Sequence, residues 1–332
     1  MLGWAMRRRE FIGVLSSVAA SGMVWPLAVY AQEKGRMYRL GSLHQSRRDA
    51  PHHVAFFEEL RRQGFVEGQN LLADTQGYGL RVDQLVEHAT KLVQTQVDVI
   101  ISAGAPAVRA AQESTKTIPI LALSSDMVAQ GFVRSLANPE GNTTGINLLA
   151  PELDGKRQEI LIEVVPGARR MASLLDPKYT SAQQAQALQE AARTHGIELV
   201  NYPVSTPDEI VSAIETAKKT GAEALNVLAS AFLYNNRPII FEHVAALRMP
   251  AMYEFPTEGE EGGLVAYGPS LVQLYRDVFA RQLVKLFRGG KPTDMPIEQP
   301  TKFELVVNLK TANALGLTIP ETFLTRADVV IE

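Results

Sequence analysis

The stretch Val97-Asp98-Val99-Ile100-Ile101-Ser102-Ala103-Gly104-Ala105-Pro106 indicates which type of fold this chain adopts. Its first five residues form an apolar run interrupted only by Asp98, which is typical of a parallel strand covered on both faces. Small residues follow, and Pro106 stands where a helix is expected to begin, since proline is tolerated in the first helical turn. The stretch therefore predicts a strand, a tight loop and a helix in succession, the unit of α/β proteins.

The same unit recurs along the chain. Thr206-Pro207-Asp208-Glu209 is a helix-capping box with proline at the first helical position, and Gly221 is expected to end that helix. We expect strands near 39–43, 71–75, 97–102 and 118–123 in a first series, and near 171–175, 198–202, 224–229, 251–253 and 264–266 in a second. The turn-rich segment 138–145 approaches the boundary between the series. The predicted fold class is α/β, with two doubly wound parallel-sheet lobes.

The first 31 residues have the layout of a twin-arginine signal peptide. Arg8-Arg9 precede an apolar run over 11–27, and Ala31 is the small residue expected before a cleavage site. A membrane anchor is the alternative, but the run is barely long enough to span the hydrocarbon and contains Gly and Ser. We expect cleavage after Ala31 and a soluble periplasmic product. No lipid anchor is expected, because the chain has no cysteine.

Composition excludes several classes of function. The chain of 332 residues carries a net charge of −3 and shows no basic face, so we expect no nucleic-acid partner. Without cysteine there are no disulfides, thiolate nucleophiles or cysteine-metal sites. Motifs of nucleophilic serine, P-loop and zinc-protease type are missing, and the spacing of His44, His52 and His53 does not put a metal site on one helix face. We therefore expect a protein that catalyses no reaction and binds neither a cofactor nor a metal. We also expect it to be a monomer.

Ligands of open parallel sheets bind beyond the carboxyl ends of the strands. The residues expected at those ends are His44, Gln45, Gly104, Ala105, Pro106, Ser125 and Asp126 in the first series, and Asp176, Tyr179, Ser230, Phe232, Tyr253 and Phe255 in the second. The helix start at Gly104 and Ala105 suits a carboxylate. Asp126 or Asp176 suits an ammonium group, and the aromatic side chains suit an apolar body. The alternative is that these acids, hydroxyls and rings are ordinary caps, turns and core.

Several long stretches resemble one family, the bacterial ABC-transporter substrate-binding proteins of the tryptophan/tyrosine-binding type, a branch of the type I periplasmic binding proteins. The matching stretches are 7–12, 64–70, 136–145, 300–312 and 314–320. The resemblance implies two lobes joined by a three-segment hinge at 147–150, 266–270 and 294–297. Lobe 1 would then comprise 37–147 plus 270–293, and lobe 2 would comprise 150–266 plus 297–332.

The resemblance also implies a role. Members of the family bind amino acids, often aromatic ones, in the cleft between the lobes and deliver them to an ABC permease. The chain departs from the family after the first strand of each lobe, where it has His44-Gln45-Ser46-Arg47 and Asp176-Pro177-Lys178-Tyr179 in place of a Gly/Ser-rich loop and Asn-Pro-Asn. The expected function is therefore that of an ABC importer's solute receptor, which closes by hinge motion around a small ligand. The expected ligand is an amino acid or a related carboxylate with an aromatic or apolar body. A ligand-presenting partner of a membrane sensor and an exported enzyme are the alternatives.

Overall fold

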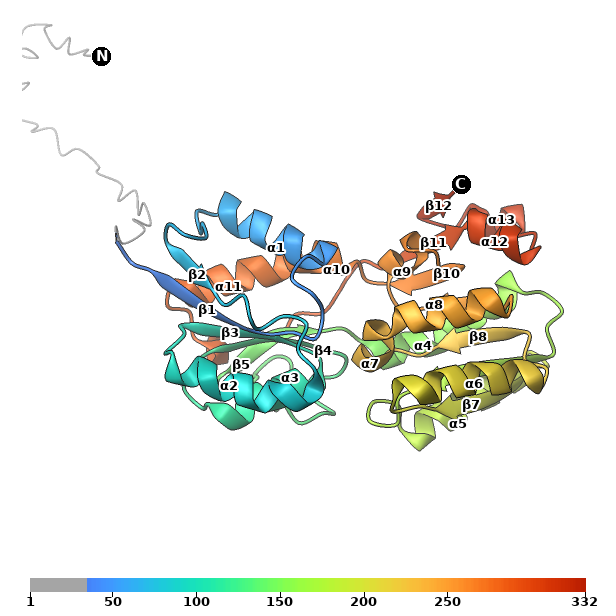
Figure 1. Ribbon diagram of the computed structural model, residues 1–332, viewed down its shortest axis with the longest axis horizontal. Coiled ribbons are helices and arrows are strands. Elements are labelled where there is room, and N and C mark those ends of the chain that lie inside the picture. Colours follow the sequence, from blue (N-terminus) through green and yellow to red (C-terminus); the bar gives the residue numbers. More distant parts are fainter. Residues whose placement is uncertain (1–34) are drawn as a thin grey trace, which may run out of the picture. The chain divides into compact units, whose positions relative to one another are not determined.

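The computed structural model describes residues 35–332. The predicted signal peptide lies outside the described residues, so its features stay predictions. Residues Met37–Glu332 form one compact unit that contains two sheets, each with helices on both faces (Figure 1). Among the residues that the structure describes, no helix is both long and apolar enough to cross a bilayer.

The first sheet has five parallel strands in the order β2-β1-β3-β4-β5. Their bounds are β1 (Tyr38–Leu43), β2 (Leu71–Ala73), β3 (Val99–Ala103), β4 (Ile120–Ser124) and β5 (Thr143–Asn147). Helices α2 (Leu85–Gln94) and α3 (Ala105–Ser114) cover one face. The other face carries α1 (Pro51–Arg62) and a returning helix made of α10 (Leu271–Gln273), the π-helical η2 (Leu274–Phe279) and α11 (Ala280–Phe287). A short 3-10 turn, η1 (Val82–Gln84), precedes α2.

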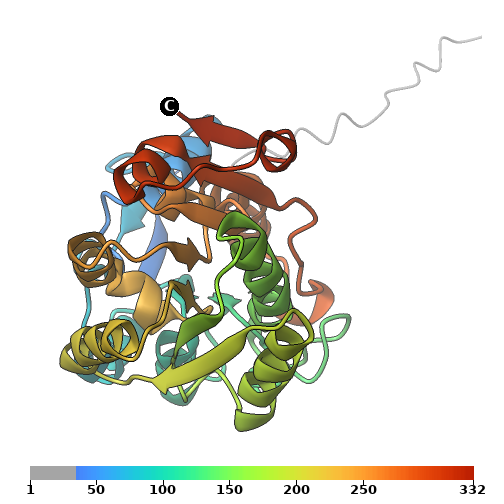
Figure 2. The same cartoon turned by 90° about the vertical axis from the view of Figure 1, so that its right-hand side faces the viewer.

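The second sheet has seven strands in the order β12-β11-β10-β9-β8-β6-β7. Their bounds are β6 (Arg170–Leu175), β7 (Glu198–Pro203), β8 (Ala224–Val227), β9 (Ala251–Tyr253), β10 (Val265–Gly268), β11 (Glu304–Asn308) and β12 (Val329–Ile331). Its helices are α4 (Ala150–Val164), α5 (Ala182–Thr194), α6 (Pro207–Lys219), α7 (Ala231–Asn235), α8 (Arg237–Ala246), α9 (Pro256–Glu260), α12 (Leu309–Leu315) and α13 (Glu321–Leu324). Helices α4 and α5 pack together on one face, and α6 and α8 on the other (Figure 2).

The predicted fold class is confirmed, since two doubly wound α/β lobes are present. One pairing departs from a parallel arrangement, because β11 runs antiparallel to β10. The chain reaches β11 from the first lobe through η3 (Pro292–Asp294) and enters the second sheet in the opposite direction.

Strand β5 lies where the sequence predicts only turns. Its residues are all buried although three of them are polar. Burial is tolerated because the hydroxyls are satisfied: Gln112 Nε2 donates to Thr143 Oγ1 at 2.8 Å, and Thr144 Oγ1 donates to the Met295 carbonyl at 2.8 Å. Gly145 has φ +146°, and a Cβ there would lie 1.8 Å from the Ala122 carbonyl oxygen. A strand of this composition carries no apolar pattern that sequence inspection can detect.

The crossings between the lobes lie beside β5. Two are the connections from β5 to α4 and from β10 to α10. The third begins near Glu298, which forms an isolated parallel bridge with Ile146 at the edge of β5. Ile297, the last residue of the predicted hinge segment 294–297, packs in the core of the first lobe.

A buried arginine joins these crossings. The Arg157 side chain is fully buried and donates to the carbonyls of Tyr267 at 2.8 Å, Ala150 at 3.1 Å and Glu254 at 3.3 Å. It also forms an ion pair with Asp154 at 2.9 Å. Arg157 therefore ties the start of α4 to the ends of β9 and β10, the two strands from which the chain reaches the cleft and the second crossing.

Candidate ligand pocket

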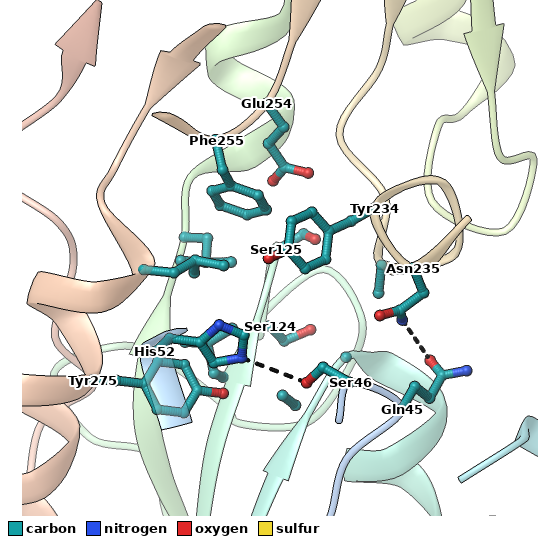
Figure 3. A pocket seen from close by; sticks show the side chains of 16 residues that line it. Gln45, Ser46, His52, Ser124, Ser125, Tyr234, Asn235, Glu254, Phe255 and Tyr275 are labelled. Atoms are coloured by element: carbon teal, nitrogen blue, oxygen red, sulfur yellow. Dashed lines mark hydrogen bonds between the residues drawn. The ribbon is translucent and has the colours of Figure 1, made fainter. Parts of the chain in front are cut away.

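A pocket with a cavity volume of about 60 Å³ lies at the carboxyl ends of strands from both sheets (Figure 3). This volume is smaller than the ~300–1,000 Å³ typical of small-molecule sites. Its lining residues are Gln45, Ser46, His52, Ala103, Gly104, Leu123, Ser124, Ser125, Leu148, Ala231, Tyr234, Asn235, Glu254, Phe255, Leu271 and Tyr275. A ligand held here touches both lobes and the returning helix.

One ionisable acid lines the pocket. Glu254 follows β9 directly and is 6 % exposed. Burial raises the pKa of the Glu254 carboxyl to about 8 against the opposing charge of Arg157, and the nearby Glu258 and Asp154 carboxyls add to the rise. The backbone N–H of Ser230 donates to the same carboxyl. The lining contains no lysine or arginine.

Aromatic rings form two walls. Tyr234 of α7 and Phe255 at the start of α9 meet edge to face with ring centroids 5.1 Å apart. Opposite them, Tyr275 of the returning helix lies 4.8 Å from the His52 ring of α1. Burial lowers the pKa of His52 well below its ordinary value, so the ring is neutral at pH 7. The walls offer flat, largely apolar surface to a ligand body.

The remaining lining is polar but uncharged. Asn235 Nδ2 donates to Gln45 Oε1 at 3.5 Å, which links α7 of the second lobe to the loop after β1. Ser46 Oγ lies 3.4 Å from His52 Nε2, and Ser124 Oγ donates to Gln130 at 2.5 Å. Hydroxyls and amides of this kind hydrogen-bond a ligand without fixing the sign of its charge.

Three of the residues predicted in the first lobe line the pocket: Gln45, Gly104 and Ser125. Four do not: His44, Ala105, Pro106 and Asp126. The His44 ring is fully buried behind the pocket, where it stacks on Tyr78 with centroids 5.3 Å apart. Asp126 accepts from the backbone amides of Val128 at 3.1 Å and Ala129 at 3.0 Å, so its carboxylate caps a turn.

The start of α3, predicted to hold a carboxylate, has its donors engaged within the protein. The Ala105 amide donates to the Tyr179 hydroxyl, which comes from the other lobe. Pro106 has no N–H, and the amides of Ala107 and Val108 both donate to the Gly104 carbonyl at 3.1 Å. Tyr179 thus occupies the position that the sequence suggests for a ligand carboxylate.

In the second lobe, Phe255 alone of the predicted residues lines the pocket. Ser230 Oγ donates to Asp176 at 3.0 Å and caps α7, so these two residues hold the α7 start in place. Phe232 packs against the core of the lobe, and the Tyr253 ring is buried 5.0 Å from Phe241. These positions agree with caps and core, the alternative stated for them above.

The sequence-based prediction of the pocket did not include the acid Glu254 or the wall residues His52 and Tyr275. Glu254 lies directly between two of the predicted residues, Tyr253 and Phe255. The sequence suggests His52 only as a metal ligand. Tyr275 and Leu271 come from a helix that returns from the second lobe, and nothing local in their sequence indicates a pocket. Within residues 35–332 there is no group of three or more His, Cys, Asp or Glu that would hold a metal ion.

Comparisons with known proteins bear on this pocket. Residues 46–331 match the family model described as ABC transporter substrate binding protein. A tyrosine-binding protein of Clostridioides difficile (strain R20291) is 24 % identical over 266 residues, which are 79 % of this chain and 75 % of the relative.

Solved structures share the fold. A conserved domain protein from Vibrio cholerae superposes with a TM-score of 0.79 at 23 % identity, covering 89 % of this chain and all of the other. An ABC domain from Streptococcus pneumoniae, solved in complex with L-Trp, gives a TM-score of 0.77 at 21 % identity with the same coverage.

Proposed function

The chain belongs to the family of ABC transporter substrate-binding proteins, and from that premise we propose that it is the periplasmic solute receptor of an ABC importer. The proposed ligand is an amino acid with an aromatic or apolar side chain. The proposed mechanism is hinge closure: the two lobes close around the ligand, and the permease in the inner membrane recognises the closed form. The proposed role is binding without chemical conversion of the ligand.

A single observation carries this proposal: both lobes contribute side chains to one pocket that has an acid at one end and aromatic walls. A ligand favours the closed form only by binding it more tightly than the open form, which requires contacts to both lobes. Gly104 supports such an arrangement, because a Cβ added there would lie 3.1 Å from the Ala231 Cβ of the other lobe. The aromatic surface of Tyr234 and Phe255 matches an aromatic or apolar ligand body. The tyrosine-binding relative and the L-Trp complex are further support for that ligand class.

A thermal-shift screen of the chain from residue 32 onward against the twenty amino acids tests the proposal. Ligand at about 100 times its dissociation constant stabilises the native state by ~2.7 kcal/mol. We expect aromatic or large apolar amino acids to raise the melting temperature, and aspartate, glutamate and glycine to leave it unchanged. A flat response to every amino acid would contradict the proposed ligand class.

Export is a separate part of the proposal. Arg8-Arg9, the apolar run after them and Ala31 support a twin-arginine signal that is cleaved during export. Replacing both arginines by lysine is expected to leave uncleaved precursor in the cytoplasm. Normal appearance of mature protein in the periplasm would refute the twin-arginine route without affecting the binding role.

A further inference from the structure

The charges around the pocket are unbalanced. Glu254, Glu258 and Asp154 are all buried, and Arg157 is packed among them. A second cation, Arg237, lies over the Tyr234 ring and acts on Glu258, but its ion pair is with Glu261 at 2.6 Å. The Arg157 guanidinium donates to Asp154 and to three backbone carbonyls, and its contact with Glu254 is to the carbonyl oxygen. Glu258 accepts from the Phe255 amide at 2.8 Å. The Glu254 carboxylate therefore faces the pocket with no cationic side chain bonded to it.

A buried carboxylate without a cationic partner is costly, and proteins respond by keeping the proton on the acid. Burial raises the pKa values of Glu254, Glu258 and Asp154 to about 8, 7 and 6. The other titratable groups that line the pocket are Tyr234, Tyr275 and His52. All three are uncharged at pH 7, because burial raises the pKa of each tyrosine and lowers that of the histidine. Before a ligand binds, the residues that line the pocket thus present a protonated acid and no fixed positive charge.

A negatively charged ligand group would find fewer partners in the pocket than a positively charged one. No lysine or arginine lines the pocket, and the first amides of α3 are bonded to Tyr179 and Gly104. A ligand carboxylate would meet only hydroxyl and amide groups such as those of Ser46, Ser125 and Asn235. These groups solvate a carboxylate but supply no charge to pair with it.

We propose that the pocket selects its ligand through a protonated amine bonded to the Glu254 carboxylate, and that the ligand carboxylate is dispensable. The inference rests on the proposed function and specifies its substrate class as aromatic or apolar primary amines, amino acids among them. On binding, Glu254 gives its proton to solvent and the ligand ammonium takes the place of that proton. The pair is then formed out of contact with water, where charge-assisted hydrogen bonds are strong.

The experiment compares ligands that share one body. Tyrosine, tyramine and 3-(4-hydroxyphenyl)propanoate form one set, and tryptophan, tryptamine and indole-3-propanoate form a second. Each is titrated calorimetrically into the wild type, Glu254→Gln and Asp126→Asn. For the set whose ring system fits the pocket, we expect the affinity of the amine to be within about tenfold of that of the amino acid. We expect the deaminated acid to bind at least 100-fold more weakly than the amino acid. This expectation follows from the strength of hydrogen bonds to charged groups.

The variants assign the effect to one carboxyl. Glu254→Gln keeps the size of the side chain and removes its charge, and we expect amine and amino-acid binding to weaken at least tenfold. Asp126→Asn alters an acid next to the lining residue Ser125 and should bind like the wild type. Wild-type titrations at pH 7 in two buffers of different ionisation enthalpy should also show release of up to one proton per ligand. That measurement needs no variant and holds even if Glu254→Gln folds poorly.

Several results would overturn the inference. They are deaminated acids binding as tightly as amino acids, amines failing to bind where amino acids do, or amino-acid binding without proton release. In each of these cases a solute still binds, so the receptor function stands. If none of the six compounds and no amino acid binds the wild type, the proposed ligand class fails together with the inference.

Discussion

Replacing Arg157 by methionine tests how strongly the buried cluster holds the second lobe together. Methionine matches the apolar stem of arginine but has no hydrogen-bond donor. The substitution would leave the carbonyls of Ala150, Tyr267 and Glu254 without the donor they have in the native protein. It would also leave the Asp154 carboxylate buried without its cation. Removing one partner of a buried ion pair typically costs ~3–5 kcal/mol.

We therefore expect Arg157→Met to lower the free energy of unfolding by about 3–5 kcal/mol. Asp154 limits the loss, because burial already raises the pKa of its carboxyl to about 6 and the acid can take up a proton when Arg157 is gone. Urea unfolding followed by circular dichroism gives the midpoint and slope from which the change is obtained. Arg134→Met is the matched control, because the pair of Arg134 with Glu140 is exposed and is worth less than ~1 kcal/mol. Equal destabilisation by the two substitutions would refute the role assigned to Arg157.

Three further predictions use the same assays. Gly145→Ala should destabilise by about 3 kcal/mol or more, because its Cβ would lie 1.8 Å from the Ala122 carbonyl oxygen; Gly155→Ala in α4, with open space around its Cβ, should not destabilise. Tyr179→Phe should cost ~1 kcal/mol by leaving the Ala105 amide without its acceptor, whereas Tyr202→Phe, whose hydroxyl bond is exposed, should be neutral. Without ligand, unfolding free energy should fall as pH rises from about 7 to 8, because Glu254 and Glu258, whose pKa values are raised to about 8 and 7, hold protons in the native state that the unfolded chain has lost. Below that range the buried histidines His44, His52 and His53, whose pKa values are lowered, oppose the trend; constant stability from pH 7 to 8 would contradict the assigned protonation.

Amine affinity should rise over the same pH range by up to tenfold per unit, because Glu254 must lose its proton before it pairs with an ammonium group. It should level off above pH 8. The two trends have opposite signs, so they cannot both come from a general change in stability.

Much of the fold could be predicted from the sequence because parallel strands buried on both faces are continuous apolar runs. Eight of the predicted runs overlap strands with little change in bounds, and the predicted run at 264–266 became β10 (Val265–Gly268). Strand β5 was missed because its core positions are threonines and a glycine. Strands β11 and β12 were not placed individually, since their positions depend on the chain's return from the first lobe.

The pocket was less accessible to sequence reasoning for a physical reason. Polar groups at strand ends serve two purposes, and local sequence does not distinguish a cap from a ligand contact. Asp126, Asp176 and Ser230 are caps, while Glu254 is turned into the pocket. The Tyr179 hydroxyl takes up the Ala105 amide, the donor that suggested a carboxylate site. This contact joins the two lobes, and no local sequence pattern encodes it.

A crystal structure of the chain from residue 32 onward, with tyrosine or tryptophan bound, tests the central claim most directly. The account predicts ligand density in the pocket between the lobes, with the ring against Tyr234 and Phe255. The ligand nitrogen should lie about 3 Å from the Glu254 carboxylate. A ligand bound elsewhere, such as the groove beside β2 lined by Asp74, His88 and Lys91, would contradict it. So would a ligand in the pocket whose ammonium group points away from Glu254.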